Sequence, residues 1–493
     1  KPLAFGVTPD DKVVALDLQE KKVAWEQPAG GKTSRIVVGN RNIYYIVDKT
    51  TLMARSVRTG AKVWSRKEKL GKNREIYGLA AAKDKLYVGG GQKGGNIRGK
   101  WRSYIEAVNG RNGKVKWRRE APGRLGAPAA KGGYVFVPYR QQYVSVLDYE
   151  EGKERVRLRA RGEFITFVRV TPEGIFFGGK NGVFKFNTKA VSGRKEKADY
   201  LKMQFADKKG KSGKSGVKAT KSSSAAGLRV VYYWDGYEPV MFDYTAYDRN
   251  RLLWRGGRGG EFAKNHAVLE YFRYFFGFDT KTGELDWVHV HTGEDVKSAM
   301  HLGERLIYAT EEGQFVVLNA VSGDRVWSHD FNVKLKGVTF DTEGFDAQGE
   351  GKKAEPVIVA LKKIIFDADR RLAVAKLFAL SQLKGLKGKK VSEILLGLIS
   401  DRKLPLNLRL RAEKVLINRS SQDSIPLFMK VLDRRYNYIT GERTRAVGPV
   451  ALALSTMKVK KAIPALAQHL QDPQTPLSTL KKIITAMSQI GGK

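Results

Sequence analysis

The sequence predicts an all-β domain over residues 1–341, a linker at 342–356 and an all-α domain over 357–493. Short runs rich in Val, Ile, Tyr and Phe recur through the first part, bounded by Gly, Asp or Asn, as is typical of strands. From Val357 onward, apolar residues recur at the i, i+3, i+4 and i+7 spacing of helices. The stretch between them, TEGFDAQGEGKKAEP, has no apolar alternation and is therefore predicted to be a linker.

A tryptophan motif repeats through the β part. In FGFDTKTGELDW, Trp287 follows Asp279 by eight residues, behind a Thr-Gly turn. The same alignment gives eight repeat positions: Trp25, Trp64, Trp117, Val156, Lys195, Trp254, Trp287 and Trp327. Three of the gaps between them are 39 residues long and one is 40. A spacing this regular indicates architecture rather than a single site.

Each repeat holds about four predicted strands. The β-rich runs that precede the motifs are NIYYIV, KLYVGG, YVFVPY, GIFFGG, RVVYYW and RLIYAT. Four strands per unit of about 40 residues predict a propeller blade, and eight repeat positions predict an eight-bladed β-propeller. A blade cannot bury both of its apolar faces alone, so the six tryptophans are expected to fill the seams between blades. Truncating such a buried tryptophan would cost about 3–5 kcal/mol.

The pattern A-x-D-x-x-T-G-x-x-x-W resembles the tryptophan-docking repeat of the PQQ-like (quinoprotein-type, BamB-like) propellers, over about residues 3–340. The resemblance implies eight blades but leaves the activity open, because one fold hosts unrelated functions. That superfamily holds PQQ-dependent alcohol dehydrogenases and the non-enzymatic outer-membrane assembly lipoprotein BamB. The dehydrogenases bind PQQ with calcium, and many stack it on a vicinal cysteine pair. This chain has no cysteine, so we expect no cofactor and no enzyme activity, with a PQQ-dependent dehydrogenase as the less favoured alternative.

The ring is expected to close through a late strand. A sheet edge left open at the first blade would be exposed to pairing with other chains, which folded proteins avoid. We therefore expect FNVKLKGVTF, residues 331–340, to return and complete the first blade.

Two long gaps in the repeat carry insertions. One contains GGGQKGGNIRG, which lacks the strand–loop–helix context of a phosphate loop and is predicted to be a flexible blade loop. The other is a basic Lys/Ser insertion at about 207–227, predicted to be disordered and solvated. A functional alternative is that this insertion binds an anionic surface through its lysines: Lys208, Lys209, Lys211, Lys214, Lys218 and Lys221. No aromatic residues alternate with these lysines, so base stacking is not indicated.

Pairs of helices are predicted in the last part. SIPLFMKVLD and AIPALAQHLQDP each carry proline in the first turn, and each is followed by a partner helix, RAVGPVALALSTM and LSTLKKIITAMSQIG. Three to four pairs of about 35 to 40 residues resemble HEAT-type repeats, best seen at 462–492. A plain helical bundle is the alternative.

Candidate metal ligands are few. His289 and His291 lie on one face of a predicted strand and could bind a metal ion together with His301 or His329, although a structural role is the simpler expectation. The motif acids Asp17, Asp148 and Asp279 are expected to bond their own turns. We therefore predict no metal, cofactor or catalytic residue.

Charge gives the strongest functional indication. The chain has 90 Lys+Arg against 50 Asp+Glu, a formal charge of +40, which favours anionic partners. No stretch of about 18 apolar residues is present. The given sequence begins at Lys1, so we expect that any leader was removed or that the sequence starts after it. We expect a non-catalytic scaffold within a larger protein complex, periplasmic or envelope-associated as the BamB resemblance implies. Binding of anionic lipid, glycan or nucleic acid, and a cytoplasmic location, remain the alternatives.

Overall fold

The structure is a computed structural model. It describes residues 1–34, 36–68, 74–92, 103–121, 125–139, 143–159, 167–171, 174–179, 182–186, 219–221, 232–234, 237–239, 262–263, 266–279, 284–302, 304–341, 344–349, 351–386, 388–419, 421–433 and 445–491. Contacts between residues divide the chain into two compact units, with the boundary between Ala354 and Glu355. The first unit is built of strands and the second of helices.

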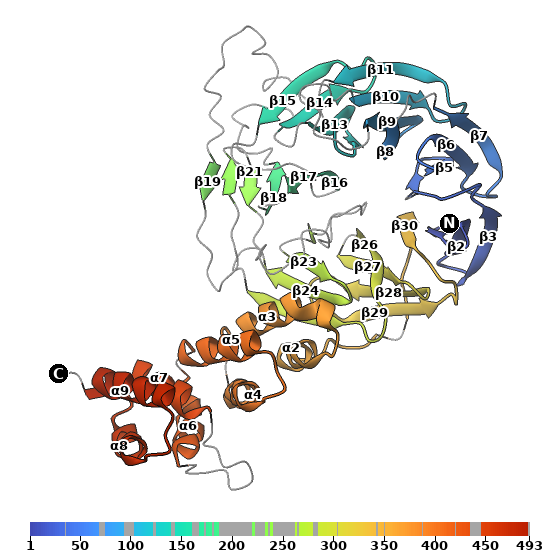
Figure 1. Ribbon diagram of the computed structural model, residues 1–493. Helices are drawn as coiled ribbons and strands as arrows, with labels where there is room; N and C mark the ends of the chain where they lie inside the picture. Colours follow the sequence, from blue (N-terminus) through green and yellow to red (C-terminus); the bar gives the residue numbers. More distant parts are fainter. Residues whose placement is uncertain are drawn as a thin grey trace, which may run out of the picture. The chain divides into compact units, whose positions relative to one another are not determined.

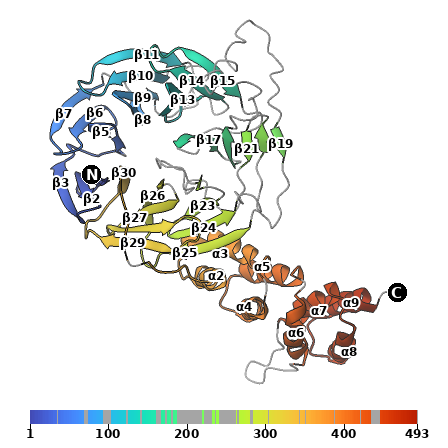
Figure 2. The same ribbon diagram turned by 180° about the vertical axis from the view of Figure 1, so that it is seen from behind.

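The first unit consists of antiparallel four-stranded sheets that follow one another around a common centre in chain order (Figure 1, and from behind in Figure 2). The first two sheets have the orders β3-β2-β1-β30 and β4-β5-β6-β7. Their strands are β1 (Leu3–Val7), β2 (Lys12–Asp17), β3 (Lys22–Pro28), β30 (Gly337–Asp341), β4 (Val37–Val38), β5 (Asn42–Val47), β6 (Thr51–Ser56) and β7 (Lys62–Lys67).

The next two sheets continue the pattern with the orders β11-β10-β9-β8 and β12-β13-β14-β15. Their strands are β8 (Arg74–Ala82), β9 (Lys85–Gln92), β10 (Ser103–Asn109), β11 (Val115–Ala121), β12 (Ala129–Lys131), β13 (Tyr134–Tyr139), β14 (Tyr143–Asp148) and β15 (Glu154–Arg159).

The following part holds a four-stranded sheet, β16-β17-β18-β21, and a two-stranded one, β19-β20. Their strands are β16 (Phe167–Thr171), β17 (Gly174–Gly179), β18 (Gly182–Phe186), β19 (Ala219–Lys221), β20 (Tyr232–Trp234) and β21 (Tyr237–Pro239).

The last two sheets of this unit have the orders β22-β23-β24-β25 and β26-β27-β28-β29. Their strands are β22 (Phe262–Ala263), β23 (His266–Tyr271), β24 (Tyr274–Asp279), β25 (Leu285–Val290), β26 (Val296–Leu302), β27 (Arg305–Thr310), β28 (Gln314–Asn319) and β29 (Arg325–Asp330). The described residues thus contain seven four-stranded sheets, which make this part of the chain propeller-like.

Five of the six β-rich runs named from the sequence are strands with the predicted bounds: β5, β9 up to its sixth residue, β13, β17 and β27. In the sixth, RVVYYW, the described residues Tyr232–Trp234 form β20. The prediction of a flexible loop at GGGQKGGNIRG was wrong for its first four residues, which belong to β9 and pair with β10 and β8. Gly90 is needed there because the ring of Tyr104 would lie 2.4 Å from a Cβ atom at that position.

The predicted closure is confirmed. β30 pairs antiparallel with β1 along five residues, from Leu3 opposite Asp341 to Val7 opposite Gly337. The pairing strand is shorter than the predicted 331–340, and residues Phe331–Lys336 lead into it. Strand β1 therefore lies between β2 and β30, with both of its edges paired.

Some of the residues predicted to be a linker pack against the first unit. Phe345 and Ala347 are buried, and the ring of Phe345 meets that of Trp327 edge-on, with 5.3 Å between centroids. The Ala354 N–H donates to Asp324 Oδ1 at 2.7 Å. The sequence did not predict this packing, because one phenylalanine and one alanine do not form a repeating apolar pattern.

The second unit contains eight α-helices in its described residues: α2 (Val357–Phe366), α3 (Ala373–Gln382), α4 (Lys389–Ser400), α5 (Leu406–Ile417), α6 (Ile425–Leu432), α7 (Val447–Thr456), α8 (Ile463–Gln471) and α9 (Leu477–Gly491). Helices that are consecutive in the chain pack as pairs, α2 with α3, α4 with α5, α6 with α7 and α8 with α9. The second members also contact each other in the order α3, α5, α7, α9. Prolines 426 and 464 stand in the first turns of α6 and α8, as predicted.

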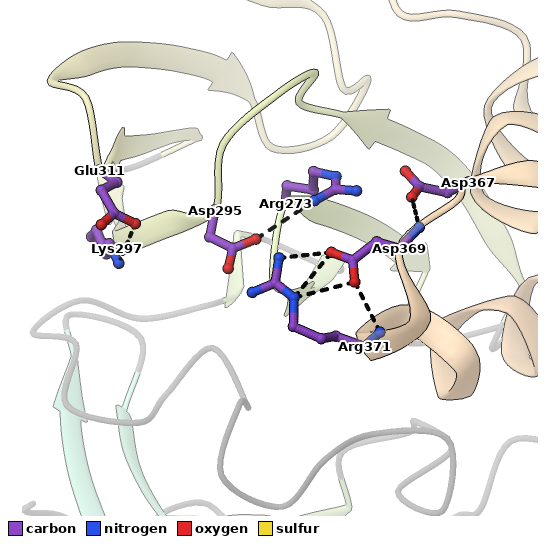
Figure 3. A network of polar contacts seen from close by, with 7 residues as sticks. All are labelled: Arg273, Asp295, Lys297, Glu311, Asp367, Asp369 and Arg371. Carbon is purple, nitrogen blue, oxygen red and sulfur yellow. Dashed lines mark hydrogen bonds and ion pairs between the residues drawn. The ribbon is translucent and has the colours of Figure 1, made fainter.

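The helical period that runs unbroken from 357 to 383 in the sequence is interrupted in the structure. The Asp369 N–H donates to Asp367 Oδ1 at 2.8 Å, and the Arg371 N–H donates to Asp369 Oδ1 at 2.9 Å (Figure 3). Short acidic side chains bond nearby backbone amides and so compete with helix formation. The chain consequently forms α2 and α3 instead of one long helix. No described helix is long and apolar enough to cross a membrane.

Candidate functional site

The tryptophans join each sheet to the next. In four of the described seams the indole Nε1–H donates to a backbone carbonyl of the following sheet: Trp25 to Val57 at 2.9 Å, Trp64 to Gly110 at 2.9 Å, Trp117 to Tyr149 at 3.0 Å and Trp287 to Ala320 at 3.1 Å. The four acceptors occupy the same position of the repeat, seven residues before the next motif's last residue. Each indole is buried.

A glycine of the next motif lies under each of these rings. A Cβ atom there would lie 2.6–2.9 Å from indole carbons at Gly60, Gly113, Gly152 and Gly323, facing Trp25, Trp64, Trp117 and Trp287 in turn. The same four glycines have φ angles of 70°, 74°, 65° and 75°. The motif glycine is thus required twice, by the left-handed turn and by the neighbouring ring.

A bulge precedes the tryptophan in every one of these sheets. The strand register shifts between Ala15 and Leu16 opposite the Trp25 strand, and at the equivalent place opposite Trp64, Trp117, Trp287 and Trp327. The Val156 strand carries the same shift although its aromatic residue is lost. A bulge increases local twist and re-aims the side chains that follow it.

The closing seam is built differently. Lys21 takes the glycine position of the first sheet, with a φ of 55°. Trp327 packs in a cluster with Leu18, Phe345 and Ala347. The stretch predicted as a linker therefore supplies the apolar partner of this tryptophan.

The remaining predicted residues are mostly outside the described part of the chain. Trp254 and the lysines 208, 209, 211, 214 and 218 lie outside the described residues, as does the repeat position Lys195. Lys221 is the last residue of β19. The anion-binding role of this tract stays a prediction.

The residue two positions after the tryptophan also faces the next sheet. Arg66 forms an ion pair with Glu68 at 2.5 Å and another with Glu106, whose side chain is fully buried. Arg118 approaches Glu106 at 3.5 Å and lies over the Tyr104 ring, 3.7 Å from its centroid. Burial raises the pKa of Glu106, with the nearby Arg66 opposing this shift. This seam therefore carries a buried charged cluster.

At Trp287 the same position is His289. His289 Nε2 lies 2.7 Å and His291 Nδ1 3.1 Å from the hydroxyl of Tyr308, which is buried in the following sheet. Burial lowers the pKa of His289 to about 3 and also lowers the pKa of His291. Both rings are therefore neutral near pH 7. The alternative that these histidines share a metal ion gains no support, since they meet at a phenol, and His329 instead packs edge-on against Phe331.

The motif acids do bond their turns as expected where their contacts are known. Asp17 Oδ1 accepts the Gln19 and Glu20 amides at 3.1 and 2.9 Å, and Asp148 Oδ1 accepts the Glu151 amide at 2.7 Å.

Asp279 lies in a group that the sequence did not indicate. Its carboxylate, His266 and Asp286 offer three ligand atoms that lie within 4.8 Å of one another, the one such group among the described residues. Sequence reasoning missed this group because its members are 13 and 7 residues apart on three strands. Only the strand register brings them together.

The helical unit exposes apolar side chains beside basic ones. Leu406 and Leu410, one turn apart on α5, are 60% and 53% exposed, on the side of α5 opposite the buried Leu408 and Ala412. Leu477 and Ile484 on α9 are 69% and 57% exposed. Residues 352–493 carry 28 Lys+Arg and 10 Asp+Glu, a formal excess of 18 positive charges.

Helices α5, α7 and α9 form one layer of this unit. Lys482 of α9 reaches Glu413 of α5 at 2.7 Å. Lys482 passes α7 at Gly448, where a Cβ atom would lie 2.8 Å from its side chain. A larger residue at 448 would require the Lys482 side chain to shift.

Comparison with solved structures gives low sequence identities throughout. BamB from Moraxella catarrhalis is 12% identical, with 68% of this chain and 84% of that chain covered and a TM-score of 0.35. Dihydro-heme d1 dehydrogenase NirN in complex with DHE is 15% identical, with coverages of 69% and 75% and a TM-score of 0.44. The quinohemoprotein alcohol dehydrogenase from Comamonas testosteroni is 14% identical, with coverages of 67% and 66% and a TM-score of 0.37.

No curated protein matches the chain in a sequence search. A family profile described as "Outer membrane protein assembly factor BamB" matches residues 3–119, 101–195 and 221–348. These matches cover well over half of the 493 residues and coincide with the sheets joined by the tryptophan seams. The chain therefore belongs to this PQQ-like, BamB-type family of β-propeller repeat proteins.

Proposed function

We propose that the protein is a non-catalytic interaction subunit of a larger assembly associated with the bacterial envelope. In this proposal the first unit is an eight-bladed propeller and the second a run of HEAT-like helix pairs. Membership of a family described by an outer-membrane assembly factor supports the envelope setting. The consecutive helix pairs, and the contacts that join their second members in the order α3, α5, α7 and α9, support the HEAT-like interpretation.

The observation that carries the proposal is the exposed leucine pair of α5, Leu406 and Leu410. Exposed Arg402, Lys403 and Lys414 flank it in the chain. An exposed apolar pair with exposed basic residues near it in the chain fits a protein surface that has apolar residues bordered by carboxylates. The partner in this proposal is therefore an acidic protein that docks on α5.

A photo-reactive amino acid in place of Leu410, in the full chain in its native host, tests this. One acidic protein should be crosslinked there and not from a matched probe at Val115, an exposed apolar residue of β11. The double variant Leu406→Ser/Leu410→Ser should lower the affinity of the purified pair at least tenfold, with an unchanged circular dichroism spectrum. Affinity should also fall about tenfold or more between low and physiological salt.

Two results would contradict the proposal. Crosslinking from Leu410 no stronger than from Val115 would exclude α5 as the docking site. Preferential binding of nucleic acid over heparin and over anionic vesicles would instead support the nucleic-acid alternative, which the charge of +40 also allows. Fractionation of the native cells tests the envelope setting separately.

A further inference from the structure

We propose that His266, Asp279 and Asp286 bind a divalent metal ion of the zinc type. The three residues come from neighbouring strands of one sheet, β23, β24 and β25. One imidazole nitrogen and two carboxylate oxygens form a ligand set that suits Zn²⁺. A fourth position would be left to water.

The strand register creates the group. His266 is the cross-strand partner of Asp279 in the β23–β24 pairing. In the β24–β25 pairing, Phe278 faces Leu285 and Gly277 faces Trp287, so Asp286 is the extra residue of the bulge. A bulge re-aims side chains, and here it places Asp286 beside His266.

The distances are close to those of a metal site. His266 Nε2 lies 2.8 Å from Asp286 Oδ2, and all three ligand atoms lie within 4.8 Å of one another. Ligand atoms of a tetrahedral zinc ion, with bonds of about 2.0–2.1 Å, lie about 3.3 Å apart. Small side-chain rotations would therefore close the site around an ion.

The surroundings also favour a cation. The His266 side chain is 11% exposed and that of Asp286 41% exposed, so one ligand is largely buried and the other is accessible to solvent. The second ring nitrogen of His266, Nδ1, is buried and has no hydrogen-bond partner, which leaves Nε2 as the ring nitrogen that faces a carboxylate. Two carboxylates close together repel each other, and a divalent ion offsets that repulsion.

The repeat architecture accounts for the motif acid Asp279 but does not require His266 or Asp286. In other sheets the cross-strand partners of the motif acid or amide are Leu3, Lys85, Tyr134 and Arg305. The residues before the tryptophans Trp25, Trp117 and Trp327 are Ala24, Lys116 and Val326. His266 and Asp286 therefore stand beside the motif acid Asp279 at positions where the other sheets named here have no ligand pair.

Isothermal titration of the tag-free, chelator-treated full chain with ZnCl₂ tests the proposal. We expect one equivalent of Zn²⁺ to bind, and we expect His266→Gln and Asp286→Asn each to weaken that binding at least tenfold. His329→Gln is the matched control, since it removes a histidine outside the group, and it should leave the affinity unchanged. Asp286 is the more exposed of the two, so Asp286→Asn keeps the test valid if His266→Gln does not fold.

Trp287 provides a second readout because it follows Asp286 directly. Co²⁺ bound at the group should quench part of the tryptophan fluorescence, and Trp287→Phe should remove that quenching while leaving the zinc stoichiometry at one. Absence of Zn²⁺ binding at 100-fold molar excess, or binding that neither variant weakens, overturns the proposal. Tighter binding of Ca²⁺ than of Zn²⁺ would overturn the assigned metal type, since Ca²⁺ prefers oxygen ligands alone.

Discussion

The seams behind Trp64 and Trp287 are built around the same contact, here called the joint, in which an indole meets a carbonyl and a glycine of the next sheet. They differ in the side chains beside that contact, here called the filler. In both, an indole donates to a backbone carbonyl of the next sheet and covers a glycine with positive φ. Two residues later the first seam has Arg66 paired with a buried Glu106, whereas the second has His289 bonded to Tyr308. The joint is the same in both seams, whereas the filler is charged in the first and neutral in the second.

The largest effect should come from breaking the joint itself. Gly113→Ala adds a Cβ atom 2.9 Å from the Trp64 ring at a φ of 74°. We expect a loss of about 3 kcal/mol, from about 1 for the left-handed backbone and about 2 for overpacking. Chemical denaturation followed by tryptophan fluorescence measures it.

Gly132→Ala is the matched control for this change. Its φ is also positive, at 59°, but no atom lies within 4 Å of the added Cβ. It should cost only about 1 kcal/mol. Equal losses for the two variants would mean that the indole contact does not constrain the glycine.

The indole hydrogen bond should matter more at Trp287 than at Trp64. The Gly110 carbonyl that accepts from Trp64 also accepts from Asn42 Nδ2 at 3.0 Å and from the Tyr44 hydroxyl at 3.1 Å. Trp64→Phe therefore leaves that carbonyl paired. We expect Trp287→Phe to cost about 2 kcal/mol, roughly 1 more than Trp64→Phe, in the same denaturation experiment. The reverse order would show that the two joints are not distinguished by their acceptors.

The neutral filler should make stability fall on acidification. Burial holds the pKa of His289 at about 3, below the ordinary value of 6.5. Between pH 6.5 and 3 the unfolded chain takes up a proton that the folded chain does not. Stability contributed by this group is thus full above pH 6.5 and is lost as the pH falls, by at most about 1.4 kcal/mol per pH unit. His289→Gln should flatten the curve of unfolding free energy between pH 6.5 and 5; an unchanged slope would contradict this.

The charged filler should have the opposite and smaller pH effect. The pKa of Glu106 is raised by burial, so the folded state binds this proton more tightly than the unfolded state does. Its contribution to stability is present at low pH and is lost as the pH rises through the folded pKa. Glu106→Gln removes that gain, and we expect a steeper loss of stability on acidification towards the ordinary glutamate pKa of 4.5 than in the unmodified chain. A shallower curve in this variant would show that the ion pair with Arg66 outweighs burial.

Most of the sheet architecture could be predicted from the sequence because it repeats. The strands β5, β13, β17 and β27 and the return of β30 follow from β-rich runs and from the need to cover a sheet edge. The double requirement on Gly113 could not be predicted, since it depends on a ring from the preceding sheet. The interruption between α2 and α3 could not be predicted either, because the apolar period continues through it. Local contacts between acidic side chains and backbone amides, as at Asp367 and Asp369, end the first helix there.

The candidate sites were less predictable than the fold. His289 and His291 were candidate ligands from their spacing, but a tyrosine of the next sheet binds both rings. His266 and Asp286 gave no spacing signal, because a one-residue bulge decides which side chains meet. The exposed leucine pair of α5 follows the same i, i+4 spacing as a core face, so only the packing distinguishes it.

The pairing of β1 with β30 has a consequence for biosynthesis. Strand β1 is synthesised before its partner at Gly337–Asp341, which is made more than 300 residues later. At a synthesis rate of roughly 5–20 residues per second, the nascent chain carries the apolar edge LAFGV unpaired for tens of seconds. Such an edge recruits other strands, so a chaperone that shields the nascent amino-terminal region should raise the yield of native protein more than one that acts after release.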